Sequence, residues 1–321
     1  MDTTLARISH LPAPAADSFA DSLMAGLAKS PKEMGCKYFY DEAGSRLFDQ
    51  ICELPEYYQT RTETALLSRY APEIAALMGP GMEIVEFGAG SLRKVRILLD
   101  AAQDLRAYTP LDISGGYLGE VVRALAAEYP ALTLRPLVGD FTLPLSIPGL
   151  PGNPRRAGFF PGSTIGNFKP DAAMALLRRM RGVLNGGGLL IGVDLVKDPV
   201  RLHAAYNDAG GVTAQFNKNL LARANRELSA DFDLDAFAHY APYNAYATRI
   251  EMYLVSLKRQ SVTLCGQRFE FAQGEAVHTE DSHKYTIESF REMACRAGFN
   301  PRAVWTDEDR LFSLHWLESR S

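Results

Sequence analysis

The clearest indication of the fold comes from residues 82–102, MEIVEFGAGSLRKVRILLDAA. A short apolar strand runs into a turn with two glycines, and apolar residues at helical spacing follow. The same alternation of strand and helix signals continues to residue 196. Further strands are expected within 107–114, 132–141, 157–168 and 188–196, and further helices within 116–130 and 171–184. This rhythm predicts an α/β domain with a doubly wound, mainly parallel sheet.

The alternation stops after residue 196. Residues 197–284 contain a mostly helical half and then two strand stretches, 249–260 and 261–275, which are expected to pair with each other in antiparallel fashion. A helix within 286–298 and two strands within 301–319 are placed to return to the first sheet. A second structural unit is therefore expected to interrupt the α/β domain.

Composition and charge narrow the class of partner. The 321 residues carry 34 Lys and Arg against 38 Asp and Glu, a formal charge of -4, so no basic surplus favours nucleic acid. Four cysteines without CxxC spacing predict reduced thiols and no zinc site: Cys36, Cys52, Cys265 and Cys295. The sequence shows neither a signal peptide nor an apolar run that could span a membrane. A cytoplasmic protein acting on a small molecule is expected.

The turn after the first strand is the first candidate ligand contact. In open parallel sheets, ligands bind beyond the carboxyl ends of the strands, and Gly88 and Gly90 leave the backbone there open to a ligand. A dinucleotide fingerprint would need glycine at position 93, where the sequence has Arg93, so the pyrophosphate of NAD is not expected. A glycine turn of this kind is also compatible with a tight turn alone.

Acidic residues end the next two strands. Asp112 is placed to accept the hydroxyl groups of a ribose, and Asp140 could accept the exocyclic amine of an adenine that packs beside Phe141. A lone Asp in this position is usually a helix cap. The occurrence of such features at three successive strand ends favours an adenosine site.

Seven stretches resemble the histidine-specific, S-adenosylmethionine (SAM)-dependent methyltransferases of ergothioneine biosynthesis. They lie in the family's order from about residue 36 to the C-terminal region: KYFYDEAGSRLFDQICELPEYYQTRTE, VEFGAGSLRK, PLDIS, GDF, FPGSTIGNF, AAYNDAGGVTAQFNKNLL and HTEDSHKY. The motifs FYD, STIGNF and HTExSxKY are far more specific than the glycine turn.

The resemblance implies a domain division and an activity. It implies a Rossmann-like class I SAM-dependent methyltransferase core at 62–196 and 285–321, and an α+β substrate-binding domain at 9–61 and 197–284. The implied reaction converts L-histidine by successive α-amino methylations to trimethylhistidine (hercynine). A monomer that needs no metal, nucleic acid or membrane is expected.

The resemblance also assigns residues to each ligand. SAM is assigned to Gly88, Lys94, Asp112, Asp140 and Phe141. Lys94 would reach the methionine carboxylate, although without the family it reads as a solvated lysine on the first turn of a helix. The substrate side falls on Tyr40, Tyr57, Gly162, Asn167, Tyr206, Met252, Glu280 and Ser282.

Two pairs of these residues suit the two ends of histidine. Asn167 and Tyr206 offer an amide N–H and a phenol O–H to the carboxylate, although Asn at a strand end is also a common turn former. Glu280 and Ser282, two residues apart in an extended segment, are expected to project to one side and to hold the imidazole. An exposed charged strand end is the alternative reading of that segment.

Three further residues are also expected to contact the substrate. Tyr40 and Tyr57 are expected to close over the amine and the ring, with plain aromatic packing as the alternative. Tyr40 and the Gly162 carbonyl are the candidates for positioning the reacting amine, and neither is an assured base. Asp281 and His283 depart from the usual family wording but should point to the opposite face.

Two other functions remain open on the sequence. One is the same reaction on another amino acid such as tryptophan, which Glu280 disfavours because an indole ring does not suit a buried carboxylate. The other is a SAM-binding protein without catalysis, which the intact candidate residues at both ends of the pocket disfavour.

Overall fold

The computed structural model describes residues 8–11 and 18–319. These residues form two compact units. The core unit contains the described residues up to 11, together with 59–196 and 284–319. The second unit contains 18–58 and 197–283. The chain passes from one to the other at 58/59, 196/197 and 283/284, where the sequence placed the borders at 61/62, 196/197 and 284/285.

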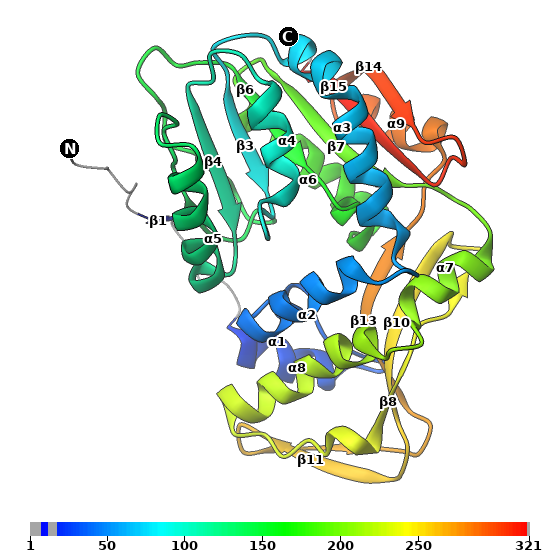
Figure 1. Cartoon of the computed structure of the whole chain (residues 1–321). Helices are drawn as coiled ribbons and strands as arrows, with labels where there is room; N and C mark the ends of the chain where they lie inside the picture. The colour runs from blue at the N-terminus through cyan, green and yellow to red at the C-terminus, as the bar shows by residue number, and fades with distance from the viewer. Residues whose placement is uncertain (1–7, 12–17, 320–321) are drawn as a thin grey trace. The chain divides into compact units, whose positions relative to one another are not determined.

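An eight-stranded sheet runs through the core unit (Figure 1). Its order is β1 (Ser9–His10), β5 (Leu137–Val138), β4 (Ala107–Asp112), β3 (Glu83–Phe87), β6 (Arg156–Phe160), β7 (Gly188–Asp194), β15 (Phe312–Ser319) and β14 (Phe299–Thr306). All neighbours pair in parallel except β15, which is antiparallel to both β7 and β14. The chain moves from β3 to β4 on one side and later to β6 on the other, so the strand order reverses at β3. The predicted Rossmann-like core is confirmed.

One short strand differs from the predicted domain division. Ser9 and His10, assigned from the sequence to the substrate-binding domain, pair with Leu137 and Val138 at the edge of the core sheet. A two-residue strand has too little periodicity to show which sheet it joins.

Helices cover both faces of the core sheet. One face packs against α3 (Tyr58–Met78), α4 (Arg93–Ala101) and α5 (Gly115–Glu128), and the other packs against α6 (Pro170–Val183) and α9 (Ile287–Arg296). Strand β3 shows why: Ile84 belongs to the first apolar cluster, whereas Val85 and Phe87 belong to the second. Because successive strand side chains point to opposite faces, a strand that is buried along its whole length needs a helical layer on each side.

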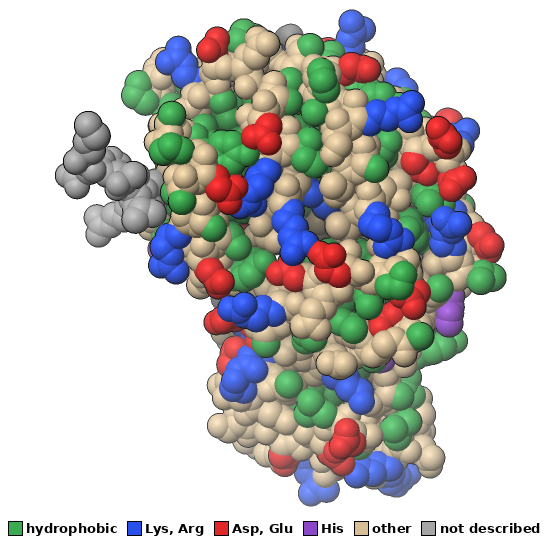
Figure 2. All heavy atoms as spheres, in the orientation of Figure 1, with side chains coloured by type: hydrophobic (Ala, Val, Ile, Leu, Met, Phe, Trp, Pro, Cys, Tyr) green, Lys and Arg blue, Asp and Glu red, His purple; other side chains and the backbone are tan. Residues whose placement is uncertain are grey.

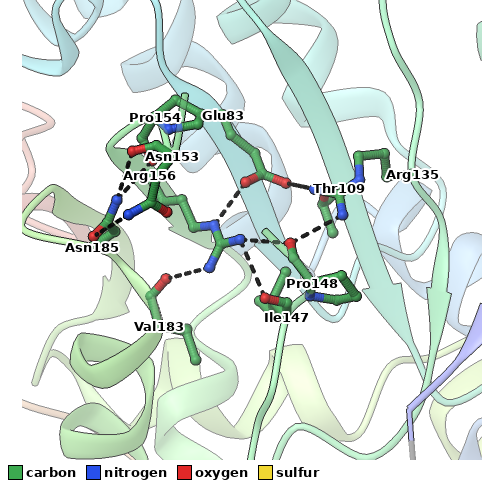
Figure 3. A network of polar contacts seen from close by, with 10 residues as sticks. All are labelled: Glu83, Thr109, Arg135, Ile147, Pro148, Asn153, Pro154, Arg156, Val183 and Asn185. Atoms are coloured by element: carbon green, nitrogen blue, oxygen red, sulfur yellow. Dashed lines mark hydrogen bonds and ion pairs between the residues drawn. The ribbon is translucent and has the colours of Figure 1, made fainter. Parts of the chain in front are cut away.

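A buried polar network fastens the edge at which the strands begin (Figure 3). Glu83, at the start of β3, accepts the Thr109 hydroxyl at 2.6 Å, Arg135 Nη1 at 2.7 Å and Arg156 Nε at 2.7 Å. The other guanidinium nitrogens of Arg156 donate to the carbonyls of Val183, Ile147 and Pro148. The carboxylate therefore joins β3, β4, β6 and the segment before β5 at one point.

The second unit combines a small sheet with helices. Its sheet has the order β2 (Lys32–Glu33), β13 (Ala276–His283), β10 (Arg249–Ser256), β8 (Phe237–Tyr240), and β9 (Tyr243–Asn244) also pairs with β10. Its helical segments are α1 (Phe19–Leu27), η1 (Cys36–Phe39), α2 (Glu42–Glu53), α7 (Pro199–Tyr206), α8 (Val212–Leu228) and η3 (Leu234–Ala236).

One predicted strand pairing is wrong. Residues 261–275 do not form the expected strand pair with the 249–260 stretch: in the strand register only Gln260, the last residue of that stretch, lies opposite one of them, Phe271. They form most of a separate hairpin, β11 (Gln260–Leu264) with β12 (Gln267–Phe271), and β10 pairs instead with β13. The two residues of the hairpin turn, Cys265 and Gly266, both have positive φ, 49° and 77°, which is the turn geometry that suits a two-residue hairpin. Cysteine at the first of these positions hid the turn in the sequence.

The outer surface carries both signs of charge. On the face shown in Figure 2, acidic and basic side chains are interspersed. No helix among residues 8–11 and 18–319 is long and apolar enough to cross a membrane.

Candidate active site

The loop after β3 is tied to the end of β4. Gly88 and Gly90 have φ of 73° and 51°, a conformation that side chains disfavour. The Gly88 and Ala89 amides both donate to the Leu111 carbonyl, at 2.8 and 3.2 Å. The loop therefore bends back across the sheet edge, and a Cβ at Gly88 would lie 3.5 Å from the Phe141 ring. Glycine is required here by its φ rather than by lack of space.

Asp112 ends β4 and holds the glycine loop. Its carboxylate accepts the Gly90 amide at 3.2 Å and the Ser114 amide at 2.8 Å. Burial raises the pKa of Asp112, and the backbone N–H donors act against that rise. Asp112 therefore stabilises the turns at Gly90 and Ser114, and its carboxylate lies beside the loop that begins at Gly88.

Asp140 and Phe141 follow β5. Asp140 accepts the Thr142 amide at 2.8 Å and its hydroxyl at 2.5 Å. The Phe141 ring packs edge-on against Phe160, with ring centroids 5.6 Å apart. The structure thus brings Phe141 to Gly88 and the ends of β3 and β4 together, as the adenosine-site hypothesis requires.

Lys94 lies in the first turn of α4 and forms an ion pair with Glu63 of α3. Glu63 is fully buried, with 0% of its surface exposed, and its two oxygens also accept the Gly162 amide at 3.0 and 2.9 Å. Sequence analysis did not single out Glu63, because one glutamate in a helix has no informative spacing. Its burial is the signal, and only the structure supplies it.

Gly162 and Asn167 lie on the turn that follows β6. Gly162 has φ 77°, and Asn167 ends the short 3-10 helix η2 (Thr164–Asn167). Ser163, with φ 55°, accepts the Asp194 amide through its hydroxyl at 2.9 Å, so the turn is bound to the end of β7. Both candidate residues therefore belong to the core unit and to the same edge of its sheet.

The other substrate candidates belong to the second unit. Tyr206, the last residue of α7, has its hydroxyl 2.7 Å from the Ser282 hydroxyl on β13, and both residues are buried. Met252 on β10 lies directly opposite Glu280 on β13 in the strand register. Directly paired residues of antiparallel strands share a face, so these two side chains are neighbours. The pairing shifts immediately after them, at Met252/Tyr253.

Asp281 points away from this group. It pairs with Arg249 at 3.1 Å and with His278 at 3.0 Å. The alternation that placed Glu280 and Ser282 on one side of the segment and Asp281 on the other agrees with these contacts.

Tyr40 and Tyr57 lie in a chain of edge-on aromatic contacts. Ring centroids are 5.7 Å apart for Tyr40 and Phe48, 6.2 Å for Phe48 and Tyr57, and 6.5 Å for Tyr57 and Tyr206. Phe216 packs against Tyr40 from α8, at 5.7 Å. Burial raises the pKa of Tyr57 far above its ordinary value, and the nearby ionisable Tyr206 raises it further. Tyr57 is therefore a neutral phenol over the whole physiological range.

Comparison with known proteins decides the family. Residues 19–319 match the model of a family described as "Histidine-specific methyltransferase, SAM-dependent". The chain belongs to this histidine-specific, SAM-dependent methyltransferase family.

Three relatives illustrate the family. A histidine N-alpha-methyltransferase of Mycolicibacterium smegmatis is 45% identical, over 94% of this chain and 96% of that protein. A Mycobacterium tuberculosis protein of the same name is 42% identical, over 90% of this chain and 91% of its own length. Ergothioneine biosynthesis protein 1 of Neurospora crassa is 30% identical over 89% of this chain, which matches 33% of that longer protein.

As a member of this methyltransferase family, the chain uses SAM, and the residue types at the core edge fit that cofactor. SAM carries an adenosine at one end and an ammonium and a carboxylate at the other. The Asp112 carboxylate is a suitable acceptor for ribose hydroxyls, and the Phe141 ring, 3.5 Å from the Cβ position of Gly88, offers an aromatic surface. Lys94 supplies a cation.

Proposed function

We propose that this methyltransferase transfers methyl groups from SAM to the α-amino group of L-histidine, in three successive steps that yield hercynine for ergothioneine biosynthesis. The family match and the mycobacterial relatives named histidine N-alpha-methyltransferase support histidine as the substrate. The relative named ergothioneine biosynthesis protein 1 supports the pathway. The observation that carries the proposal is the buried group of Ser282, Tyr206, Glu280 and Met252 in the second unit.

On the cofactor side, five residues are proposed to hold SAM: Gly88, Lys94, Asp112, Asp140 and Phe141. When bound, SAM supplies a methyl group on a positively charged sulfur. Asp112 is proposed to accept the ribose hydroxyls, Asp140 the adenine amine, and Lys94 to pair with the methionine carboxylate. The φ of 73° at Gly88 keeps the loop in its bent form, and Phe141 packs beside the adenine.

On the substrate side, Glu280 and Ser282 are proposed to bind the imidazole. An imidazole N–H needs an acceptor, and its other nitrogen needs a donor. A carboxylate and a hydroxyl that project to one side of β13 supply both. The Ser282 hydroxyl lies 2.7 Å from the Tyr206 hydroxyl, and this hydrogen bond gives way when both hydroxyls donate to histidine, because each has only one proton. Asn167 is proposed to donate its amide N–H to the substrate carboxylate, and Tyr206 its phenol O–H.

The reacting amine must lose a proton before it attacks the methyl group. The Tyr57 phenol is kept neutral by burial, so it serves as a hydrogen-bond donor and an aromatic wall rather than as a base. Tyr40 and the Gly162 carbonyl are proposed to orient the amine so that its lone pair points along the line of displacement. The aromatic rings of Tyr40 and Tyr57 also suit a product that carries a permanent positive charge.

A methyl-transfer assay tests the substrate. The purified protein is incubated with SAM and each of the common amino acids, and mass spectrometry follows the products. Histidine should be the preferred acceptor, with mono-, di- and trimethylated forms appearing in order. Preference for tryptophan would contradict the proposal, and SAM binding without transfer to any amino acid would identify a non-catalytic protein.

The specificity group provides a sharper test in the double variant Glu280→Ala with Met252→Val. The first change removes the acceptor for the imidazole N–H, and the second shortens the residue opposite it, which opens room for a larger ring. Preference should move from histidine toward tryptophan in steady-state kinetics with both amino acids. If the double variant keeps the full preference for histidine, the imidazole does not lie beside Glu280.

We further propose that the enzyme acts as a monomer in the cytoplasm. All four cysteines lie among the described residues, and none forms a disulfide, in keeping with a reducing compartment. Light scattering of the purified protein tests the monomer, because a mass near twice 35.3 kDa would contradict it.

A further inference from the structure

Glu63 is a buried carboxylate that none of the roles above uses. It lies in the second turn of α3, with none of its surface exposed. Its oxygens accept the Gly162 amide at 3.0 and 2.9 Å, and one of them pairs with the Lys94 ammonium. One carboxylate therefore contacts both the side chain assigned to the SAM carboxylate and the backbone of the turn assigned to the substrate amine.

The surrounding sheet leaves room for this carboxylate. A Cβ at Gly192, in the middle of β7, would lie 2.0 Å from Glu63 Oε1 and 2.9 Å from the Phe312 ring. Any larger residue at position 192 would have to displace Glu63. Placing an ionised carboxylate in a buried site is costly unless charged and hydrogen-bonding partners surround it. Here Lys94 and the Gly162 amide are those partners, so the three groups depend on one another.

We propose that Glu63 is a positioning residue for the methyltransferase, acting on SAM through Lys94 and on the β6 turn through Gly162. Lysine has a long flexible side chain that loses rotamer entropy when it is fixed. The ion pair with a buried, immobile carboxylate holds the Lys94 ammonium before the cofactor arrives, so less entropy is lost on binding. The role of the Gly162 turn rests on the proposed function, whereas the effect on SAM does not require histidine to be the substrate.

The test is a double-mutant cycle on the full-length protein. Glu63→Gln keeps an acceptor for the Gly162 amide but removes the charge that holds Lys94. Lys94→Met removes the other partner, and the two changes are also combined. Glu73→Gln is the matched control, because it removes the same charge from the same helix, where Glu73 accepts the Trp305 indole N–H at 3.0 Å. Calorimetry measures SAM affinity without any amino acid, and thermal unfolding checks that each variant is folded.

Glu63→Gln should weaken SAM binding about tenfold, and Glu73→Gln should change it by less than about twofold. In the Lys94→Met background, Glu63→Gln should add less than about a twofold further loss, because the same contact is already absent. Unchanged SAM affinity in folded Glu63→Gln overturns the proposal. A tenfold loss that persists in the Lys94→Met background also overturns it, since Glu63 would then act on the fold rather than through Lys94.

A second route displaces Glu63 without changing its charge, and it decides the matter if Glu63→Gln does not fold. Gly192→Ala places a methyl group 2.0 Å from Glu63 Oε1, so that the carboxylate must move. Gly182→Ala is the control, because a methyl group at position 182 would have no neighbouring atom within 4 Å. Gly192→Ala should weaken SAM binding in the native background and much less in the Lys94→Met background. Equal effects in both backgrounds would contradict the proposal. Failure of the native protein to methylate histidine would reject the proposed function and leave the measured SAM effect standing.

Discussion

The two edges of the core sheet use buried carboxylates in different ways. Where the strands begin, Glu83 is bound by two guanidiniums and a hydroxyl (Figure 3). Where the strands end, Asp112 accepts the amide of Gly90 in the glycine loop and the amide of Ser114. Glu63 accepts the Gly162 amide and pairs with the Lys94 ammonium. In the first arrangement two arginines and a threonine surround the carboxylate. In the second, the carboxylates lie beside loops and contact backbone amides or a lysine. We therefore propose that the first edge contributes stability and that the second edge binds the ligand.

Strand β3 carries two buried glutamates with different partners. Glu83 begins the strand in the arginine network. Glu86 lies on the same strand, fully buried, and accepts the Tyr108 hydroxyl. Burial raises the pKa of Glu86 to about 8. Both glutamates are buried, but only Glu83 has arginine partners. The partners, and not burial alone, therefore determine whether a buried glutamate forms an ion pair.

The largest effect is expected from Glu83→Ala. Removing this acceptor leaves Arg156 and Arg135 without their carboxylate in a largely buried site, so the free energy of unfolding should fall by about 3–5 kcal/mol. Urea unfolding measures the loss. SAM affinity of the folded fraction should change little, because no candidate ligand residue is touched.

A matched control for that change is Glu128→Ala. Glu128 pairs with Arg96 on the surface, where 46% of its side chain is exposed, and exposed pairs of this kind contribute little to stability. If both variants lose stability to the same small extent, the starting edge of the sheet is not the stabilising one.

Asp112→Ala should produce the reverse pattern. SAM binding should weaken by roughly 1–3 kcal/mol through lost charge-assisted hydrogen bonds to the ribose. Titration calorimetry on the folded variant measures it. Unchanged affinity would remove Asp112 from the site and leave it as a turn former for Gly90 and Ser114.

Asn167→Ala should have a smaller and more selective effect. Loss of one amide donor to the substrate carboxylate should raise the Michaelis constant for histidine, by an amount that corresponds to a loss of about 1 kcal/mol of binding free energy. SAM affinity should not change. Steady-state kinetics and calorimetry together separate the two ligands. An equal loss for both would show that Asn167 shapes the turn after β6.

The smallest effect is expected from Glu86→Gln below about pH 4.5, because there the carboxyl is protonated in both the folded and the unfolded state and a neutral amide resembles it. The native pKa, about 8, lies above the ordinary value of 4.5. The stability that Glu86 contributes is therefore fully present below about pH 4.5 and is lost as the pH rises from there to about 8, because the unfolded chain releases the proton first. Thermal unfolding should show the native protein losing stability between about pH 4.5 and about 8 more steeply than Glu86→Gln, with little further difference at higher pH. Parallel curves would mean that Glu86 does not hold the extra proton.

The sequence alone predicted the core because its signals are local. The glycine turn at Gly88 and Gly90 follows an apolar strand, and Asp112 and Asp140 end the next strands, so a parallel sheet brings them to one edge. The side-by-side projection of Glu280 and Ser282 also follows from strand alternation. These inferences need only the alternation of side chains along a strand and the fact that parallel strands end at the same edge of a sheet.

Contacts between distant segments required the tertiary structure. The pairing of β10 with β13 rather than with the adjacent hairpin depends on which strands meet in space. Glu63 gains its partners from 31 and 99 residues away along the chain, and Gly192 makes room for it from a third element. The sequence determined which residues end the strands, because backbone periodicity is local. Only the tertiary structure decided which buried carboxylate meets which cation, because charge pairing depends on distance in space and not on spacing in the chain.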